Sequence, residues 1–196
     1  MAIDTKLIMK LRDMTGAGLS DVKGALDESG GDVDKAVEIL RKKGAMKAAK
    51  KSSERTAEQG LIEAYVHSNG RSGAIVEIRC ETDFVARNED FKNLAHDIAM
   101  QIVASGALYL IPQDVPASVI EKEKEIYRQQ LKDEGKPEQM LEKILQGKLE
   151  KFYQEVCLLN QPFIKDDSIS IKELIDQNIA KIGEKIEIVN FFRLTF

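Results

Sequence analysis

The chain has 196 residues, of which 43% are hydrophobic and 32% are charged. This length accommodates one domain, or one domain with a small appendage, and the composition is typical of a globular protein with a well-solvated surface. The 29 Lys and Arg residues against 33 Asp and Glu give a net charge of −4, which argues against direct binding of nucleic acid. No stretch approaches the ~20 apolar residues of a membrane span, and two cysteines are too few for a disulfide scaffold.

The N-terminus and the cysteines predict a cytoplasmic protein. Acidic and basic residues interrupt the apolar ones in the first 12 positions, so we expect no secretory segment there. Cys80 and Cys157 lie far apart without a CxxC spacing, and reduced thiols are therefore expected. The two histidines stand near no cysteine pair, so we expect no metal site, and no motif indicates a cofactor.

Residues 1–44 predict three short helices, because apolar residues recur at three- and four-residue spacing in three successive stretches. Glycine pairs separate these stretches, and each begins after a residue that can cap a helix N-terminus. The candidate caps are Asp4, Ser20 and Asp32. The third helix carries basic residues in its last turn and is expected to stop at Gly44.

Residues 45–58 predict a basic linker. Residues 41–55 hold seven Lys or Arg against one acid, Glu54. Two interpretations stay open: a solvated, flexible tether, and a basic patch that meets an acidic partner surface.

Residues 59–196 predict a three-stranded antiparallel sheet packed with helices, so the fold class is α+β. Alternating apolar residues predict a strand over 62–67, and Asn69-Gly70 predicts a tight hairpin turn in which both residues have positive φ. The return strand places Ala74, Val76, Ile78 and Cys80 on one buried face. A third strand is expected over 186–194, with a shared face of Ile186, Ile188, Asn190, Phe192 and Leu194.

Four helical stretches are expected between the hairpin and the third strand. The first begins after Asp90 as N-cap and carries an apolar stripe over three turns, from Phe91 to Val103. A second, mostly charged helix follows Ser118 as N-cap, a third extends to about Cys157, and a fourth follows residue 170.

The loop between the hairpin and the first of these helices holds the best candidates for chemistry. Glu81, Asp83, Glu89 and Asp90 could perform acid–base work if one carboxyl group were buried. The simpler interpretation makes Asp90 a helix cap and Glu81 a solvent-facing strand residue. No phosphate-binding, nucleophile or metal-binding motif accompanies the cluster.

Phe84 and Val85 are adjacent, bulky and apolar in this same loop. Two interpretations stay open. Phe84 folds back onto the following helix at Phe91, or it forms an exposed apolar tip, which usually marks a partner site.

Ordered motifs run through essentially the whole chain. They are Leu11-Arg12, Thr15-Gly16-Ala17-Gly18 with Asp21 and Lys23, Gly31-Asp32, Lys47-Ala48-Ala49-Lys50, the loop Glu81-Thr82-Asp83-Phe84-Val85-Ala86-Arg87-Asn88, Gln161-Pro162-Phe163, and Gly183-Glu184-Lys185-Ile186. Together these motifs closely resemble the bacterial translation elongation factor Ts family, and the 81–88 loop is similar to its most distinctive signature.

The resemblance implies a guanine nucleotide exchange factor for elongation factor Tu, not an enzyme that acts on a substrate bond. It implies that residues 1–44 form a three-helix, ubiquitin-associated-like module that docks on the GTPase domain of this partner. The implied docking residues are Arg12, Gly16, Ala17, Gly18, Leu19, Asp21 and Lys23. Thr82, Asp83, Phe84 and Val85 are the implied element that dislodges the partner's magnesium ion, with Asp83 and Phe84 as its wedge.

Longer members of that family have a duplicated core subdomain and a helical-hairpin insertion, whereas this chain has room for one three-stranded core over 59–196. It resembles the compact form, in which two copies contact each partner, so we expect a homodimer without direct nucleic-acid or membrane binding. Two other functions stay open. A ubiquitin-associated-type adaptor without exchange activity would leave Thr82–Val85 idle, and the sequence offers little for a hydrolase that uses Glu81 and Asp83.

Overall fold

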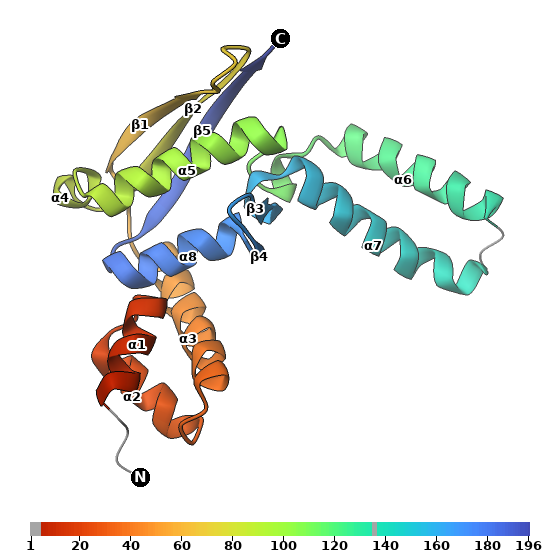
Figure 1. The fold of residues 1–196 in the computed structure, drawn as a ribbon. Helices are drawn as coiled ribbons and strands as arrows, with labels where there is room; N and C mark the ends of the chain where they lie inside the picture. The colour runs from red at the N-terminus through yellow and green to blue at the C-terminus, as the bar shows by residue number, and fades with distance from the viewer. Residues whose placement is uncertain (1–4, 135–136) are drawn as a thin grey trace. The chain divides into compact units, whose positions relative to one another are not determined.

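The computed structural model describes residues 5–134 and 137–196, and it confirms the α+β fold class (Figure 1). The predicted cap Asp4 lies outside the described residues. The chain forms two compact units. Unit 1 comprises Met1–Glu63, Val76–Asp97 and Lys172–Val189, and unit 2 comprises Ala64–Ile75, Ile98–Ile171 and Asn190–Phe196.

The helices are α1 (Thr5–Thr15), α2 (Leu19–Glu28), α3 (Val33–Glu54), α4 (Asp83–Ala86), α5 (Glu89–Ser105), α6 (Ala117–Asp133), α7 (Glu138–Val156) and α8 (Ile171–Ile182). The strands are β1 (Gln59–Val66), β2 (Ser72–Cys80), β3 (Pro162–Phe163), β4 (Asp166–Ser170) and β5 (Ile186–Thr195), and short 3₁₀ turns cover Pro112–Asp114 and Leu158–Asn160.

The three N-terminal helices pack around a small apolar core in unit 1. Its buried members are Leu11, Val22, Ala25, Leu26, Ala36 and Leu40. Asp32 caps α3 as predicted, because its carboxylate accepts a hydrogen bond from the Lys35 N–H at 3.1 Å. The predicted cap Ser20 is wrong: it lies inside α2, and Gly18 holds the cap position without a side-chain bond.

The helix end predicted at Gly44 is also wrong, because α3 continues for ten more residues to Glu54. A glycine inside a helix costs about 1 kcal/mol relative to alanine. The cost is offset by close packing within unit 1, where a Cβ at residue 44 would lie 3.7 Å from the Ala180 Cβ of α8. Residues 45–54, expected as a linker, are therefore helical. The division of the chain at 44 and 58 stays a prediction.

The basic stretch 41–55 finds partners within the same unit. Five of its side chains form ion pairs with carboxylates of this chain: Arg41 with Glu173, Lys42 with Glu38, Lys43 with Glu28, Lys47 with Asp21, and Arg55 with Glu81. Most of its charge is thus compensated locally rather than gathered into a bare positive patch.

The three larger strands form the predicted antiparallel sheet in the order β1–β2–β5, and α5 lies along one face of it (Figure 1). The predicted inner face of β2 and the apolar stripe of α5 are both buried. The buried residues are Ala74, Val76, Ile78 and Cys80 on the strand, and Phe91, Leu94, Ala95, Ile98, Ala99, Ile102 and Val103 on the helix.

The β1–β2 hairpin differs from the predicted tight turn. Among the described residues only glycines have positive φ in the left-handed region, Gly70 at 65° included, so Asn69 does not. The His67 N–H donates to the Ser72 carbonyl at 2.9 Å, which closes a longer loop. Asn69 instead accepts a hydrogen bond from the Arg71 N–H through its side chain, which stabilises the loop without a strained backbone.

The shared face predicted for β5 is wrong. Ile186 and Ile188 are buried as expected, but Phe192 and Leu194 are exposed. Val189 and Asn190 are both exposed and interrupt the alternation, so the strand changes phase there. The outer side of the sheet in unit 2 consequently carries an exposed apolar patch of Val66, Ile75, Phe192 and Leu194, which we call the sheet patch.

In unit 2, α6 and α7 pack against each other as a helical hairpin, which the sequence did not predict. The predicted cap Ser118 is wrong, since it lies inside α6, which begins at Ala117 with Pro116 at the cap position. Strands β3 and β4 form a small second sheet, also unpredicted, and the buried Gln101 holds its first strand by donating to the Pro162 carbonyl at 3.1 Å.

No helix in the described part of the chain is long and apolar enough to cross a membrane.

Candidate functional site

The loop that follows β2 folds into a helical turn rather than an irregular segment. Thr82 is extended, and its hydroxyl oxygen caps α4 by accepting a hydrogen bond from the Val85 N–H at 3.4 Å. Asn88, not the predicted Asp90, caps the next helix: its side-chain oxygen accepts from the Asp90 N–H at 2.8 Å, and Asp90 lies inside α5. Two capping residues thus fix both ends of the 82–88 segment.

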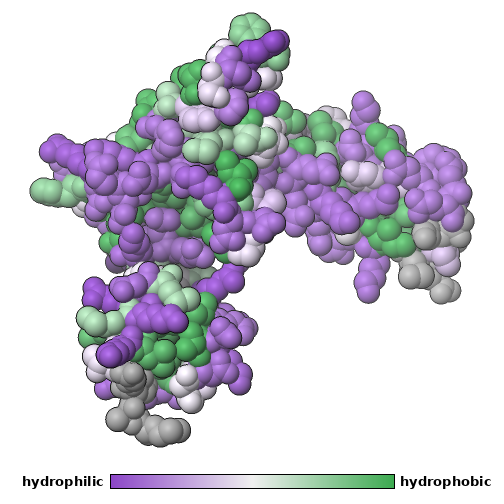
Figure 2. Space-filling model, in the orientation of Figure 1, coloured by the Kyte–Doolittle hydropathy of each residue, from purple (hydrophilic) through white to green (hydrophobic). Residues whose placement is uncertain are grey.

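Phe84 lies at the tip of this turn with 81% of its surface exposed, whereas Phe91 is fully buried in the core. The interpretation that Phe84 folds back onto Phe91 is therefore wrong, and the exposed apolar tip is the observed state. Figure 2 shows hydrophobic atoms projecting over α4 among hydrophilic surroundings. Beside Phe84, Val85 is half-buried, and Asp83 forms an ion pair with Arg87 at 3.0 Å.

The base of the turn is held by the carboxylate of Glu184, which lies in the short segment between α8 and β5. Glu184 accepts hydrogen bonds from the Glu81 N–H at 3.1 Å, from the Thr82 N–H at 3.0 Å and from the Thr82 hydroxyl at 2.7 Å. Glu81 in turn accepts from the Lys185 N–H at 2.6 Å and from Arg55 at 3.1 Å. Glu81 is thus a cross-linking residue and not the solvent-facing one that we expected.

The acidic cluster is engaged in ion pairs rather than prepared for acid–base chemistry. Partial burial opposes ionisation of Glu81, but the Lys185 N–H and the Arg55 guanidinium outweigh it and lower the pKa of this carboxyl. A general acid would need a raised pKa instead. Glu89 pairs with Lys92, and Asp90 pairs with Lys181 of α8. The geometry does not favour a hydrolase. Within residues 5–134 and 137–196, no group of three potential ligands could hold a metal ion.

The implied docking residues gather at the turn between α1 and α2. Gly16 has a φ of 65°, a conformation that glycine adopts without strain, and it reverses the chain after α1. Arg12, Leu19 and Lys23 are exposed, and 58% of the Leu19 surface is accessible. Ala17 packs against the module's apolar core. The structure therefore separates an exposed set that can contact a partner from residues that shape the turn.

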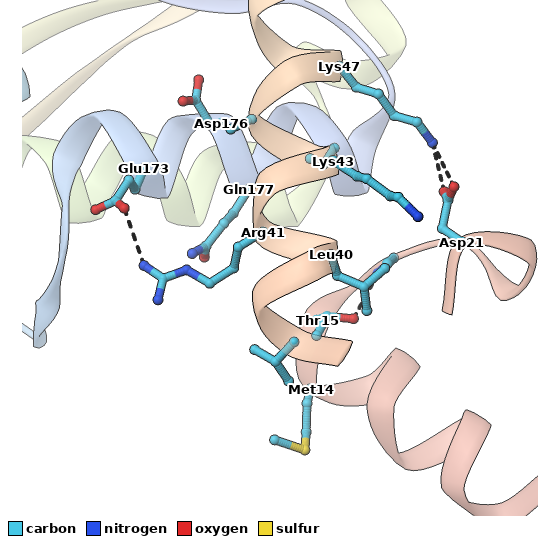
Figure 3. A pocket seen from close by; sticks show the side chains of 16 residues that line it. Met14, Thr15, Asp21, Leu40, Arg41, Lys43, Lys47, Glu173, Asp176 and Gln177 are labelled. Carbon is cyan, nitrogen blue, oxygen red and sulfur yellow. Dashed lines mark hydrogen bonds and ion pairs between the residues drawn. The ribbon is translucent and has the colours of Figure 1, made fainter. Parts of the chain in front are cut away.

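Three of the implied docking residues line a pocket of about 210 Å³ in unit 1, namely Ala17, Gly18 and Asp21. Figure 3 shows the pocket bounded by side chains of α3 and α8. Lys47 pairs with Asp21 at 2.8 Å, and Arg41 pairs with Glu173 at 3.2 Å. Since these cations at the pocket are already paired, the pocket offers no free positive cluster for a phosphate group.

Comparison with known proteins assigns the family. The family model "Elongation factor TS" matches residues 28–196. A protein named elongation factor Ts from Fervidobacterium nodosum is 56% identical over 194 residues, which cover 99% of this chain and 98% of that protein. The chain belongs to the elongation factor Ts family. A second member, from Thermotoga petrophila, is 57% identical over 98% of this chain and 96% of its own length, and one from Carboxydothermus hydrogenoformans is 54% identical over 97% and 88%.

Membership in the elongation factor Ts family makes the chain a bacterial translation elongation factor. Several residues at the site were not predicted from the sequence. Met14, near the end of α1, is 61% exposed beside the turn between α1 and α2, and no motif in the sequence singles it out. The contacts of Glu184 with Thr82 and of Arg55 with Glu81 were not predicted, because nothing in local spacing links residues so far apart in the chain.

Proposed function

We propose that this member of the elongation factor Ts family is a guanine nucleotide exchange factor. It binds the GTPase domain of elongation factor Tu, displaces the magnesium ion and promotes GDP release, so that GTP can bind again. The observation that carries the proposal is the exposed Phe84 at the tip of a turn fixed at both ends. Membership in the family supports the identity of the partner.

The proposed mechanism is a shift in a binding equilibrium and involves no bond cleavage by this chain. A GTPase holds GDP through its phosphate loop, a helix N-terminus and magnesium. A factor that binds the nucleotide-free partner more tightly than the GDP-bound partner weakens GDP binding by the same ratio, and added nucleotide expels the factor in return. The factor needs no cofactor of its own for this.

Within this mechanism, Phe84 inserts into an apolar gap of the partner and moves the elements that surround magnesium. Burying a phenylalanine side chain contributes about 1.5–3 kcal/mol, which is enough to bias such an equilibrium. Thr82 orients the turn, and Val85 supports Phe84 from its half-buried position. Asp83 exchanges its exposed pairing with Arg87 for a contact with the partner backbone. The α1–α2 turn supplies affinity and orientation through Arg12, Leu19 and Lys23.

We also propose that the protein acts in the cytoplasm as a homodimer, without binding membranes or nucleic acid directly. The sheet patch supports the dimer: Val66, Ile75, Phe192 and Leu194 are all exposed on one side of a sheet whose other side is covered by α5. Contiguous exposed apolar residues of this kind usually mark a protein contact. A second copy of the same face would cover them through a symmetric interface.

A stopped-flow assay tests the exchange function. Elongation factor Tu is loaded with fluorescent GDP and mixed with excess unlabelled nucleotide, with and without this protein. The proposal predicts faster fluorescence decay at rising protein concentration up to a plateau. Binding without any acceleration would instead support the adaptor function, in which the N-terminal module docks and the 82–85 turn is idle.

A further inference from the structure

We infer that Glu184 is a positioning residue for the Phe84 turn, an inference that rests on the proposed exchange function. It touches neither the partner nor nucleotide, and it acts through Thr82. Three features of unit 1 support this role: where β2 ends, what the Glu184 carboxylate accepts, and which side chains approach the same point from α3.

Strand β2 ends at Cys80, and the next two backbone N–H groups leave the sheet. Both donate to one oxygen of Glu184, from Glu81 at 3.1 Å and from Thr82 at 3.0 Å. The other carboxylate oxygen accepts the Thr82 hydroxyl at 2.7 Å, while the oxygen of that hydroxyl accepts from the Val85 N–H. Glu184 therefore fixes both the backbone and the side chain of the residue that caps the turn. Hydrogen bonds to a charged acceptor are the strong class.

In a second contact the roles of donor and acceptor are reversed between the two segments. We call the four residues that make these bonds the clasp: Glu81, Thr82, Glu184 and Lys185. The Glu81 carboxylate accepts the Lys185 N–H at 2.6 Å. The segment that follows β2 and the segment that precedes β5 are thus tied by reciprocal bonds. The result is a rigid base for α4, so Phe84 can be exposed without its backbone being loose. A rigid base favours insertion of Phe84 into a partner, since ordering a mobile loop on binding would cost conformational entropy.

The C-terminal end of α3 reaches the same clasp. Arg55 donates to the Glu81 carboxylate at 3.1 Å and to the Gly183 carbonyl at 3.4 Å, and Lys51 donates to the Gly183 carbonyl at 2.7 Å. Helix α3 also belongs to the three-helix module that we propose docks on the partner. Within unit 1, a chain of hydrogen bonds therefore connects the docking helix with the turn that carries Phe84.

The test compares Glu184→Ala, Glu184→Gln and the matched control Glu187→Ala. The control removes a half-exposed carboxylate of β5 that pairs with the Lys185 ammonium and leaves the Lys185 N–H in the clasp. For each variant, the maximal rate of fluorescent GDP release from elongation factor Tu and the affinity for this partner are measured separately. We expect Glu184→Ala to slow maximal release roughly tenfold with little change in affinity. Glu184→Gln should retain most of the wild-type release rate, since its amide oxygen can accept the N–H groups of Glu81 and Thr82. The control should behave as wild type.

A double-mutant cycle with Phe84→Ala distinguishes positioning from general stability. If Glu184 acts by orienting Phe84, Glu184→Ala should cause no further slowing in the Phe84→Ala background. Fully additive effects, or a rate loss that tracks a drop in affinity or melting temperature, would overturn the inference. If Glu184→Ala does not fold, Thr82→Val replaces it in the same cycle; this variant keeps Glu184 and removes the Thr82 hydroxyl, which bonds Glu184 and caps α4. Normal release by the Glu184 variant beside an active wild type overturns this inference alone, whereas an inactive wild type refutes the exchange function itself.

Discussion

The substitution Phe84→Ala isolates the proposed wedge, because this side chain does almost nothing for the free protein. With 81% of its surface exposed, Phe84 contributes little to the core, so the free energy of unfolding should change by less than about 0.5 kcal/mol. If the exposed 81% becomes buried in the partner, full burial at about 1.5–3 kcal/mol scales to about 1.2–2.4 kcal/mol. That free energy corresponds to a change of roughly 8- to 60-fold in the release rate.

The assay for this prediction is stopped-flow release of fluorescent GDP from elongation factor Tu at saturating concentrations of wild type and variant. The matched control is Phe196→Ala, which removes an even more exposed phenylalanine far along the chain from the turn. We expect slower release for Phe84→Ala only, with an affinity for the partner reduced much less than the rate. Unchanged release by Phe84→Ala, or an equal loss in the control, would refute the wedge mechanism.

Leu19, Gly60, Phe192 and the two cysteines differ in exposure and packing, and each can be tested separately. Leu19→Ala should weaken affinity for elongation factor Tu on the order of tenfold while leaving the maximal release rate intact, as titration in the same assay would show. Gly60→Ala should lower the free energy of unfolding in urea by about 1–3 kcal/mol, because a Cβ there would collide with a carbonyl of the neighbouring strand. Phe192→Glu should convert the proposed dimer to a monomer in sedimentation velocity, and an unchanged mass would exclude the sheet patch as the interface. Burial raises the pKa of Cys80 and of Cys157 from 9.0 to about 11. The free energy of unfolding should therefore fall as pH rises from 9 to 11, because the thiols ionise more readily in the unfolded chain. Iodoacetamide should react slowly with these buried thiols in the folded protein at pH 8, and fast labelling would contradict this.

Elements governed by local periodicity could be predicted from the sequence. The stripe from Phe91 to Val103 and the inner face of β2 are buried as the spacing indicates, because amphipathic patterns leave one face to bury. Asp32 caps its helix for a reason that lies within four residues. The third strand also lies where alternation placed it, over Ile186–Thr195.

Features that depend on contacts distant in sequence could not be predicted. Helix α3 passes through Gly44 because Ala180 of α8, more than 130 residues later, packs against it. The phase change at Asn190 moves Phe192 to the outer face, and alternation alone gives no sign of it. Whether Phe84 faces the core or solvent depends on the direction of a short turn, and that direction is fixed by Glu184, 102 positions away from Thr82.

Comparing affinities for two states of elongation factor Tu tests the central claim most directly. Isothermal titration calorimetry would measure binding of this protein to the partner without nucleotide and to the partner loaded with GDP and magnesium. The proposed exchange function predicts tighter binding to the nucleotide-free state, by the same factor by which this protein weakens GDP binding. Equal affinity for the two states would contradict it, because a factor without preference cannot shift the equilibrium.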